Sequence, residues 1–331
     1  MNHPDDEETV APLRRDVFYK SSDGLSLHVA DYGDVNTPWL PVVCLSGLSR
    51  NCRDFERLAL HLSTHRHRPR RVVAFDYRGR GRSEWDPDTS HYNPLTEMND
   101  VLDGMTTLGI DRAVIVGTSR GGIIAMMIGV ARPNALAGLV LNDIGPVIEP
   151  LGLARIKARI GRTPAPDNWS DAIAIQKRLH EAQFPGLSDS DWDAFVRMTY
   201  RDEDGQPAND YHPALSETLD GIEFDSPIPS LWNEFNALGD VPILAIRGEH
   251  SDILSAETLA EMAASHSRFA SVTIDGQGHA PLLLRTAVLQ RISAFITNLE
   301  GSGPPIDAVV PRDAPAFDLE TQDDIPPSDD A

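Results

Sequence analysis

The sequence predicts an α/β protein in which a doubly wound, mostly parallel sheet of about eight strands carries an inserted helical cap. Short apolar runs alternate with segments of helical periodicity through most of the 331 residues. Most of these runs are continuously apolar, as is typical of strands buried on both faces of a parallel sheet. The alternation stops after residue 146 and resumes near residue 237, which indicates an insertion.

The predicted elements follow one another in a regular order. The strand-like runs are 17–20, 25–32, 41–45, 71–76, 113–117, 137–142, 241–247 and 271–274. The segments with helical periodicity between them are 54–64, 94–108, 121–131, 255–267 and 283–299. The first two strands are separated by Ser-Ser-Asp-Gly, which favours a hairpin, and the other strands alternate with helices.

Composition divides the chain into five segments. Residues 1–16 are polar and predict a mobile arm, while 17–146 together with 237–300 form the predicted core. Residues 147–236 read as short helices and loops broken by proline, with no convincing strand, and predict the cap. Residues 301–331 carry eight carboxylates and one arginine among many prolines, which predicts a disordered acidic tail; docking of Val309, Val310 or Phe317 on the body is the alternative.

Charge and cysteine content exclude several classes of protein. The net charge of −21 argues against nucleic acid or an anionic membrane as a partner, because both attract cationic surfaces. Cys44 and Cys52 are too few for a disulfide scaffold and are expected to be buried and inert. No apolar run reaches the ~18 residues of a membrane span. The first residues do not resemble a signal peptide, so a cytoplasmic location is expected.

The segment Val-Gly-Thr-Ser-Arg-Gly-Gly at 116–122 joins a predicted strand directly to a predicted helix. A side chain at the apex of such a turn needs small residues two positions away on each side, and Gly117 and Gly121 meet that need around Ser119. The helix N-terminus directs free amides toward the serine oxygen. Ser119 is therefore the candidate nucleophile.

A serine nucleophile needs a histidine base, and the histidine needs a carboxylate. His279 follows a predicted strand and a loop with two glycines, so it is the candidate base, with His250 as the nearest competitor. Asp252 lies in the loop after the preceding strand and is the expected acid, while Glu249 is expected to shape that loop. Asp143 ends the strand that follows the nucleophile strand and is the alternative acid.

Two further sets of groups complete the predicted site. The oxyanion of a tetrahedral intermediate needs two donors, for which the backbone N–H groups of Leu48 and Arg120 are expected. Trp169, Trp192 and Trp232 are the largest apolar groups of the insertion and could line a substrate pocket, the alternative being that they pack the cap's own core. No metal site and no organic cofactor is implied.

With Ser119, Asp252 and His279 in that order, the chain resembles the α/β-hydrolase superfamily and is most similar to its capped bacterial carboxylesterases. The segment 72–85, with Asp-Tyr-Arg-Gly-Arg-Gly-Arg-Ser, matches a strand-turn motif of that superfamily, and these residues are expected to stabilise the turn without taking part in chemistry. The segment 42–59 resembles its oxyanion loop, except that Ser46 replaces the usual histidine. The resemblance covers roughly residues 17–300.

The resemblance implies a serine esterase that acts on a small-molecule ester through an acyl-enzyme. Hydrolysis of a lactone or a C–C bond on the same triad is an alternative, and so is a non-enzymatic small-molecule receptor with this fold. A serine at 119 argues against the related dehalogenases and epoxide hydrolases, which use aspartate there. The Arg120 side chain is expected either to pair within the scaffold or to hold the cap or a substrate carboxylate.

Overall fold

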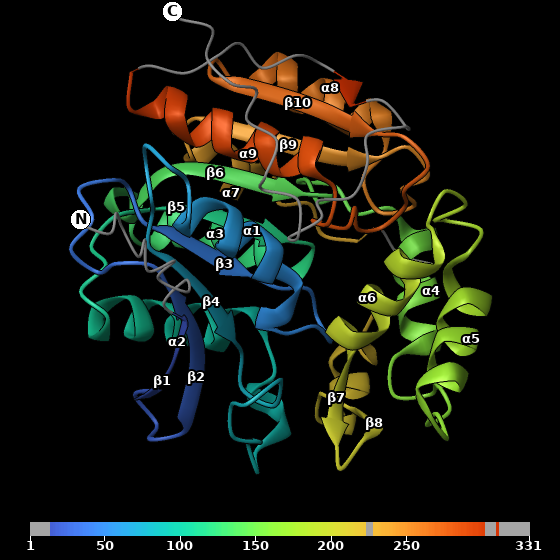
Figure 1. Cartoon of the computed structure of the whole chain (residues 1–331). Coiled ribbons are helices and arrows are strands. Elements are labelled where there is room, and N and C mark those ends of the chain that lie inside the picture. Colours follow the sequence, from blue (N-terminus) through green and yellow to red (C-terminus); the bar gives the residue numbers. More distant parts are fainter. Residues whose placement is uncertain (1–13, 223–227, 302–308, 311–331) are drawn as a thin grey trace, which may run out of the picture.

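The computed structural model describes residues 14–222, 228–301 and 309–310. Its main sheet has the strand order β1-β2-β4-β3-β5-β6-β9-β10-β11 (Figure 1). The strands are β1 (Arg14–Lys20), β2 (Ser26–Tyr32), β3 (Val42–Leu45), β4 (Val72–Asp76), β5 (Ala113–Thr118), β6 (Leu136–Asn142), β9 (Ile243–Gly248), β10 (Phe269–Ile274) and the two-residue β11 (Val309–Val310). Strand β2 pairs antiparallel with β1 and β4, and the other pairs are parallel. The predicted sheet is thus confirmed, with β11 added at its edge.

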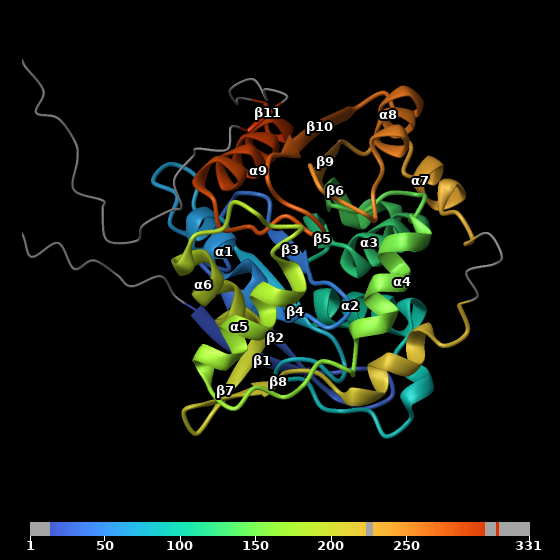
Figure 2. The same ribbon diagram turned by 90° about the vertical axis from the view of Figure 1, so that its right-hand side faces the viewer.

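Helices cover both faces of this sheet. They are α1 (Glu56–Ser63), α2 (Pro94–Thr107), α3 (Arg120–Ala131), α4 (Pro150–Arg159), α5 (Trp169–His180), α6 (Asp189–Thr199), α7 (Trp232–Ala237), α8 (Ala256–Ser265) and α9 (Thr286–Leu299). Helices α1 and α9 lie on one side of the sheet, and α2, α3, α7 and α8 lie on the other (Figure 2). Each group forms a buried apolar cluster with the strands. Two packed faces explain why the parallel strands read as uninterrupted apolar runs.

Local sequence signals set where individual helices begin. Asn93 caps α2 by accepting a hydrogen bond from the Thr96 N–H at 3.0 Å, and Pro94 takes the first helical position. Ser255 caps α8 in the same way through the Thr258 N–H, at 3.2 Å. These start positions agree with the predicted ones to within a residue, because capping chemistry is local.

The insertion after β6 lies beyond the carboxyl ends of the parallel strands (Figure 1). It contains α4, α5, α6 and an antiparallel hairpin of β7 (Tyr200–Glu203) and β8 (Gln206–Asn209). The expectation that the insertion lacks strands is therefore wrong. The hairpin carries little of the apolar pattern that predicts a strand, because its strands are four residues long and mostly polar, with Asp204-Gly205 at the turn.

The end of the predicted cap also needs correction. Helix α7 packs on the core, where Phe235 is fully buried in the same cluster as α3 and Trp232 packs against it. The segment 147–236 therefore combines a cap with a helix that belongs to the core. The reason is tertiary: the apolar face of α7 contacts α3, which no local pattern encodes.

The strand pairing near the two ends of the chain extends further than the sequence predicts. Strand β1 begins at Arg14, three residues inside the expected arm, because residues 14–16 continue the hairpin pairing with β2. In the acidic tail, Val309 and Val310 pair in parallel with Thr273 and Ile274 of β10, at the edge of the sheet. Phe317 and residues 1–13 lie outside the described residues. In the described ranges, no helix has both the length and the apolar character that crossing a bilayer requires.

Candidate active site

Ser119 sits at a strained turn between β5 and α3. Its backbone has φ 50° and ψ −114°, a conformation that few residues other than glycine adopt. A Cβ atom at Gly117 would lie 2.5 Å from the Gly121 carbonyl oxygen, and one at Gly121 would overlap the Leu45 carbonyl. The two glycines therefore make the turn possible, as the sequence predicts, and Ser119 faces the cavity under the cap.

Ser119 belongs to a chain of hydrogen bonds. Its Oγ lies 2.9 Å from His279 Nε2, and His279 Nδ1 lies 2.8 Å from Asp143 Oδ2. An Nδ1–H that donates to Asp143 leaves Nε2 free to accept the hydroxyl proton of Ser119. The arrangement is that of a nucleophile, a base and an orienting acid.

The third member is Asp143, so the prediction of Asp252 as the acid is wrong. The reason is the register of the sheet: Asn142 pairs with Thr118 on the neighbouring strand, which places Asp143 level with Ser119. Asp143 is fully buried, and its carboxylate accepts hydrogen bonds from the Gly248 N–H at 2.7 Å and the Ser251 hydroxyl at 2.6 Å. The loop after β9 thus supplies donors to the acid instead of the acid itself.

Asp252 turns toward the cap. Both of its oxygens accept hydrogen bonds from the Arg155 guanidinium of α4, at 2.6 and 2.8 Å. Burial opposes ionisation, but the hydrogen bonds from Arg155 outweigh it and lower the pKa of Asp252. Glu249 accepts the Gly276 N–H at 2.7 Å, which fits the loop-shaping role expected of it.

The predicted donors of the oxyanion hole flank Ser119. Arg120 opens helix α3, and Leu48 lines the cavity together with Ser119. In the described residues, neither backbone N–H donates to another protein group. The Leu48 carbonyl is held by Arg80, whose Nε donates to it at 2.8 Å. This bond turns the peptide around Leu48 and links the loop to the arginine-rich turn.

The Arg120 side chain pairs within the scaffold. Its Nε donates to Glu97 Oε2 at 2.8 Å, and Arg80 approaches the other oxygen of the same carboxylate at 2.8 Å. Burial of Glu97 would raise its pKa, but the two guanidinium charges more than compensate and lower it. Arg120 is thus committed to the scaffold and not to a substrate carboxylate.

The cavity under the cap measures about 220 Å³. Its apolar wall includes Phe184, Phe195, Leu179, Met198, Ile156 and Leu282, and its polar wall includes Arg50, Arg155, Arg159, Gln176 and His180. None of the three tryptophans expected there lines it. Trp192 is buried behind the wall and packs edge-on against Phe195, with ring centroids 5.9 Å apart.

The other two tryptophans also have structural roles. The Trp169 indole N–H donates to the Gly205 carbonyl at 3.0 Å, and its ring stacks under Arg197. Trp232 packs against Phe235 on the core. Of the three tryptophans, Trp192 is the one that packs directly against a phenylalanine of the cavity wall.

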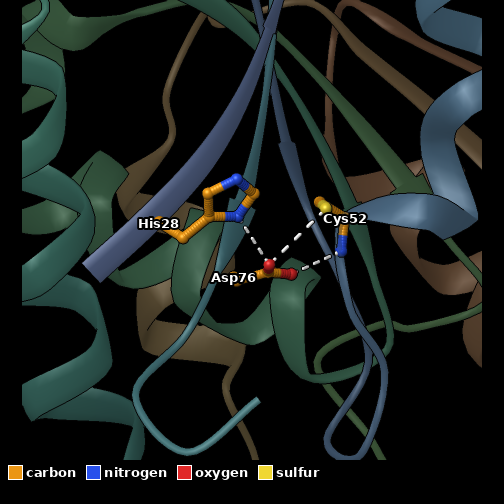
Figure 3. Close-up of side chains that lie close together, drawn as sticks. All are labelled: His28, Cys52 and Asp76. Atoms are coloured by element: carbon orange, nitrogen blue, oxygen red, sulfur yellow. Dashed lines mark hydrogen bonds and ion pairs between the residues drawn. The ribbon is translucent and has the colours of Figure 1, made fainter. Parts of the chain in front are cut away.

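A buried cluster of His28, Cys52 and Asp76 lies within the core (Figure 3). His28 Nδ1 lies 2.7 Å from Asp76 Oδ2, and its Nε2 lies 3.0 Å from Asp16 Oδ1, so both ring nitrogens have carboxylate partners. Asp76 also accepts the Cys52 and Arg82 backbone N–H groups, at 2.7 and 3.1 Å. Burial, together with the charge of Asp76, raises the pKa of Cys52 and keeps its thiol protonated.

The cluster therefore links strands β1, β2 and β4 to the segments that contain Cys52 and Arg82. Asp76 begins the arginine-rich turn, and a Cβ at Gly81 would overlap its carboxylate, which explains the glycine. The structure supports the stabilising role expected of this motif. Both cysteines are buried and unpaired, as expected.

Comparison with known proteins agrees with this architecture. A model described as the alpha/beta hydrolase family matches residues 42–291. The chain is 30% identical over 279 residues to the 3-hydroxybutyrate-oligomer hydrolase of Cupriavidus necator, which covers 81% of this chain and 91% of that protein. It is 27% identical over 237 residues to the 2-(acetamidomethylene)succinate hydrolase of Mesorhizobium japonicum, over 70% of this chain and 79% of that protein.

A solved structure of an alpha/beta hydrolase is also similar to this chain. An alpha/beta hydrolase from Novosphingobium aromaticivorans is 34% identical, with a TM-score of 0.77 over 86% of this chain and 98% of that one. The family match spans β3 to α9 and includes Ser119, Asp143 and His279. By sequence and by structure, the chain belongs to the alpha/beta hydrolase family.

Proposed function

We propose that this hydrolase cleaves carboxylic esters through a covalent acyl-enzyme. The observation that carries the proposal is the continuous chain from Ser119 Oγ through His279 to Asp143, with links of 2.9 and 2.8 Å. His279 Nε2 takes the hydroxyl proton while Ser119 Oγ attacks the ester carbonyl. Asp143 holds the ring in the required tautomer and stabilises the imidazolium that forms.

The remaining steps use the same groups. The backbone N–H groups of Leu48 and Arg120 stabilise the tetrahedral oxyanion. The imidazolium of His279 returns its proton to the alcohol oxygen as the ester C–O bond breaks, leaving the acyl group on Ser119. A water then gives a proton to His279 and attacks the acyl carbonyl. His279 returns that proton to Ser119 Oγ as the bond between Oγ and the acyl carbon breaks, which releases the acid and restores the serine.

The names of the relatives suggest which compounds to test first as substrates. Because one relative is named a 3-hydroxybutyrate-oligomer hydrolase, short 3-hydroxybutyrate oligomers join p-nitrophenyl esters in the first panel. A lactone and a vinylogous diketone test the alternative reactions on the same triad. Many turnovers per protein molecule would support an enzyme, whereas a single slow turnover would favour a receptor.

The direct test is Ser119→Ala. The change removes the acyl-enzyme route and should reduce kcat by about 10⁵–10⁶, the loss usual for a triad nucleophile. A fluorophosphonate should label the unmodified protein and not the variant, as mass spectrometry of the intact chain would record. Ser49→Ala is the matched control, because Ser49 lines the same cavity while both His279 nitrogens are bonded elsewhere. Labelling that survives in Ser119→Ala would refute the proposal.

A further inference from the structure

Three guanidinium groups line the cavity, and two of them have carboxylate partners. Arg50 Nε donates to Asp54 Oδ2 at 2.8 Å, and the Arg50 guanidinium stacks over the Phe195 ring. Arg155 forms the two-pronged pair with Asp252. The third, Arg159, has no ion pair in the described residues.

Arg159 occupies the last position of α4, four residues after Arg155, so both side chains project from the same face of the helix. Arg155 holds both oxygens of Asp252, and no ion pair joins Asp252 to Arg159 in the described residues. The Nη1 atom of Arg159 is buried and has no hydrogen-bond partner in the described residues. Leaving a buried donor of a cation unpaired is costly, so an acceptor on a ligand that pairs with Arg159 would be stabilised.

His180 of α5 lines the same cavity and also has an unsatisfied atom. Its Nδ1 is buried without a hydrogen-bond partner in the part of the chain that the structure describes. Burial and then the charge of Arg159 lower the pKa of His180 to about 3, so the ring is neutral near pH 7. A neutral imidazole offers one N–H donor without adding charge.

The net charge of the ionised side chains on the cavity wall indicates which charge a ligand should carry. Asp54 and Asp252 offset Arg50 and Arg155, which leaves the single positive charge of Arg159 in a protein whose net charge is −21. A guanidinium binds a carboxylate through two parallel hydrogen bonds. One excess charge matches a monoanion better than a phosphate, which carries up to two.

We infer that Arg159 binds a free carboxylate of the substrate, so that the preferred esters carry a carboxylate on either the acyl or the alcohol side. The inference rests on the proposed function for the reaction, but the binding site it assigns is separate from the triad. Arg159 selects the substrate, while Ser119 and His279 react with it.

The experiment compares substrates that differ only in charge. On the alcohol side, 3-acetoxybutyrate is paired with 3-acetoxybutyramide; on the acyl side, mono-p-nitrophenyl glutarate is paired with its carboxamide analogue. The unmodified protein should prefer the carboxylate in at least one pair. Arg159→Gln should lower the ratio of kcat/KM between carboxylate and carboxamide by roughly 10- to 100-fold, as expected when a charged hydrogen bond is lost.

Two matched variants sharpen the result. Arg162→Gln removes the same charge from an exposed position three residues away that does not line the cavity, and the ratio should stay unchanged. Arg159→Lys keeps the charge without the two-pronged geometry and should restore part of the preference. No preference in the unmodified protein, or equal ratios for it and Arg159→Gln, would overturn the inference.

A binding arm separates this inference from the proposed function. Glutarate and 3-hydroxybutyrate are titrated calorimetrically into full-length Ser119→Ala, with and without Arg159→Gln. A Kd that rises at least tenfold on loss of Arg159 supports the carboxylate site even if no ester is hydrolysed. Undetectable binding of both acids, or the same Kd in both variants, refutes the site even if esters are hydrolysed.

Discussion

Asp143 and Asp252 are two carboxylates of similar sequence context whose surroundings give them different roles. Asp143 is fully buried, with His279, Ser251 and the Gly248 N–H around its oxygens. Asp252 is partly exposed and bonded to Arg155. Asp143 is hydrogen-bonded to His279 and orients that ring, whereas Asp252 is bonded to Arg155 and connects the core to the cap.

Replacement of each acid by its amide tests this distinction. Asp143→Asn should lower kcat by about 10⁴, because the amide favours the wrong tautomer of His279 and cannot stabilise the imidazolium. Asp252→Asn should lower kcat far less, since it disturbs contacts with Arg155 and Gln183 and leaves the bond between Asp143 and His279 in place. Steady-state kinetics on one p-nitrophenyl ester gives the ranking, with circular dichroism as the check on folding. A larger loss in Asp252→Asn would return the acid role to that residue.

At the scale of an element, the turn between β5 and α3 depends on residues without side chains. Gly121→Ala should destabilise the protein by at least about 1–3 kcal/mol, since its Cβ would overlap the Leu45 carbonyl of the neighbouring strand. Urea denaturation measures the free energy of unfolding. Gly221→Ala is the matched control, because no atom lies within 4 Å of its Cβ and its backbone is not left-handed. Equal stabilities of the two variants would mean that the turn tolerates a side chain.

In the cap, residues that are far apart in the sequence pack together around the cavity. Phe195 of α6 and Phe184 of the loop between α5 and α6 line the cavity, and Trp192 packs behind them. Helix α4 carries Arg155 and Arg159 toward the core. The cavity wall thus combines apolar side chains from several cap segments with two arginines from α4.

For the whole molecule, the buried His180 makes stability depend on pH. Burial first, and then the charges of Arg159, Arg155 and Arg50, lower its pKa from 6.5 to about 3 in the folded state. Between these two values the unfolded chain binds more protons than the folded one. The free energy of unfolding should therefore fall as the pH falls from 6.5 toward 3, and no change from this residue is expected above 6.5.

The contribution of His180 can be isolated by substitution. His180→Gln removes the titrating ring and should flatten the decrease of melting temperature between pH 6.5 and 4. His67→Gln is the control, because His67 is exposed and its removal should leave the slope as it is. Because burial also lowers the pKa of His61 and of His266, part of the slope should persist in His180→Gln. An unchanged slope would show that the ring is not buried in the neutral form.

Local sequence patterns predict the order of strands and helices in the core, the turn at Ser119 and the pairing of that serine with His279. These features rest on apolar periodicity, capping and glycine positions, which act over a few neighbouring residues. Only the tertiary structure decided that Asp143 faces His279, because that contact depends on the register of β5 against β6. It likewise decided that α7 joins the core, that phenylalanines instead of tryptophans line the cavity, and that Arg159 Nη1 has no hydrogen-bond partner in the described residues. Each of these depends on how residues far apart in the chain pack, and no local pattern records such contacts.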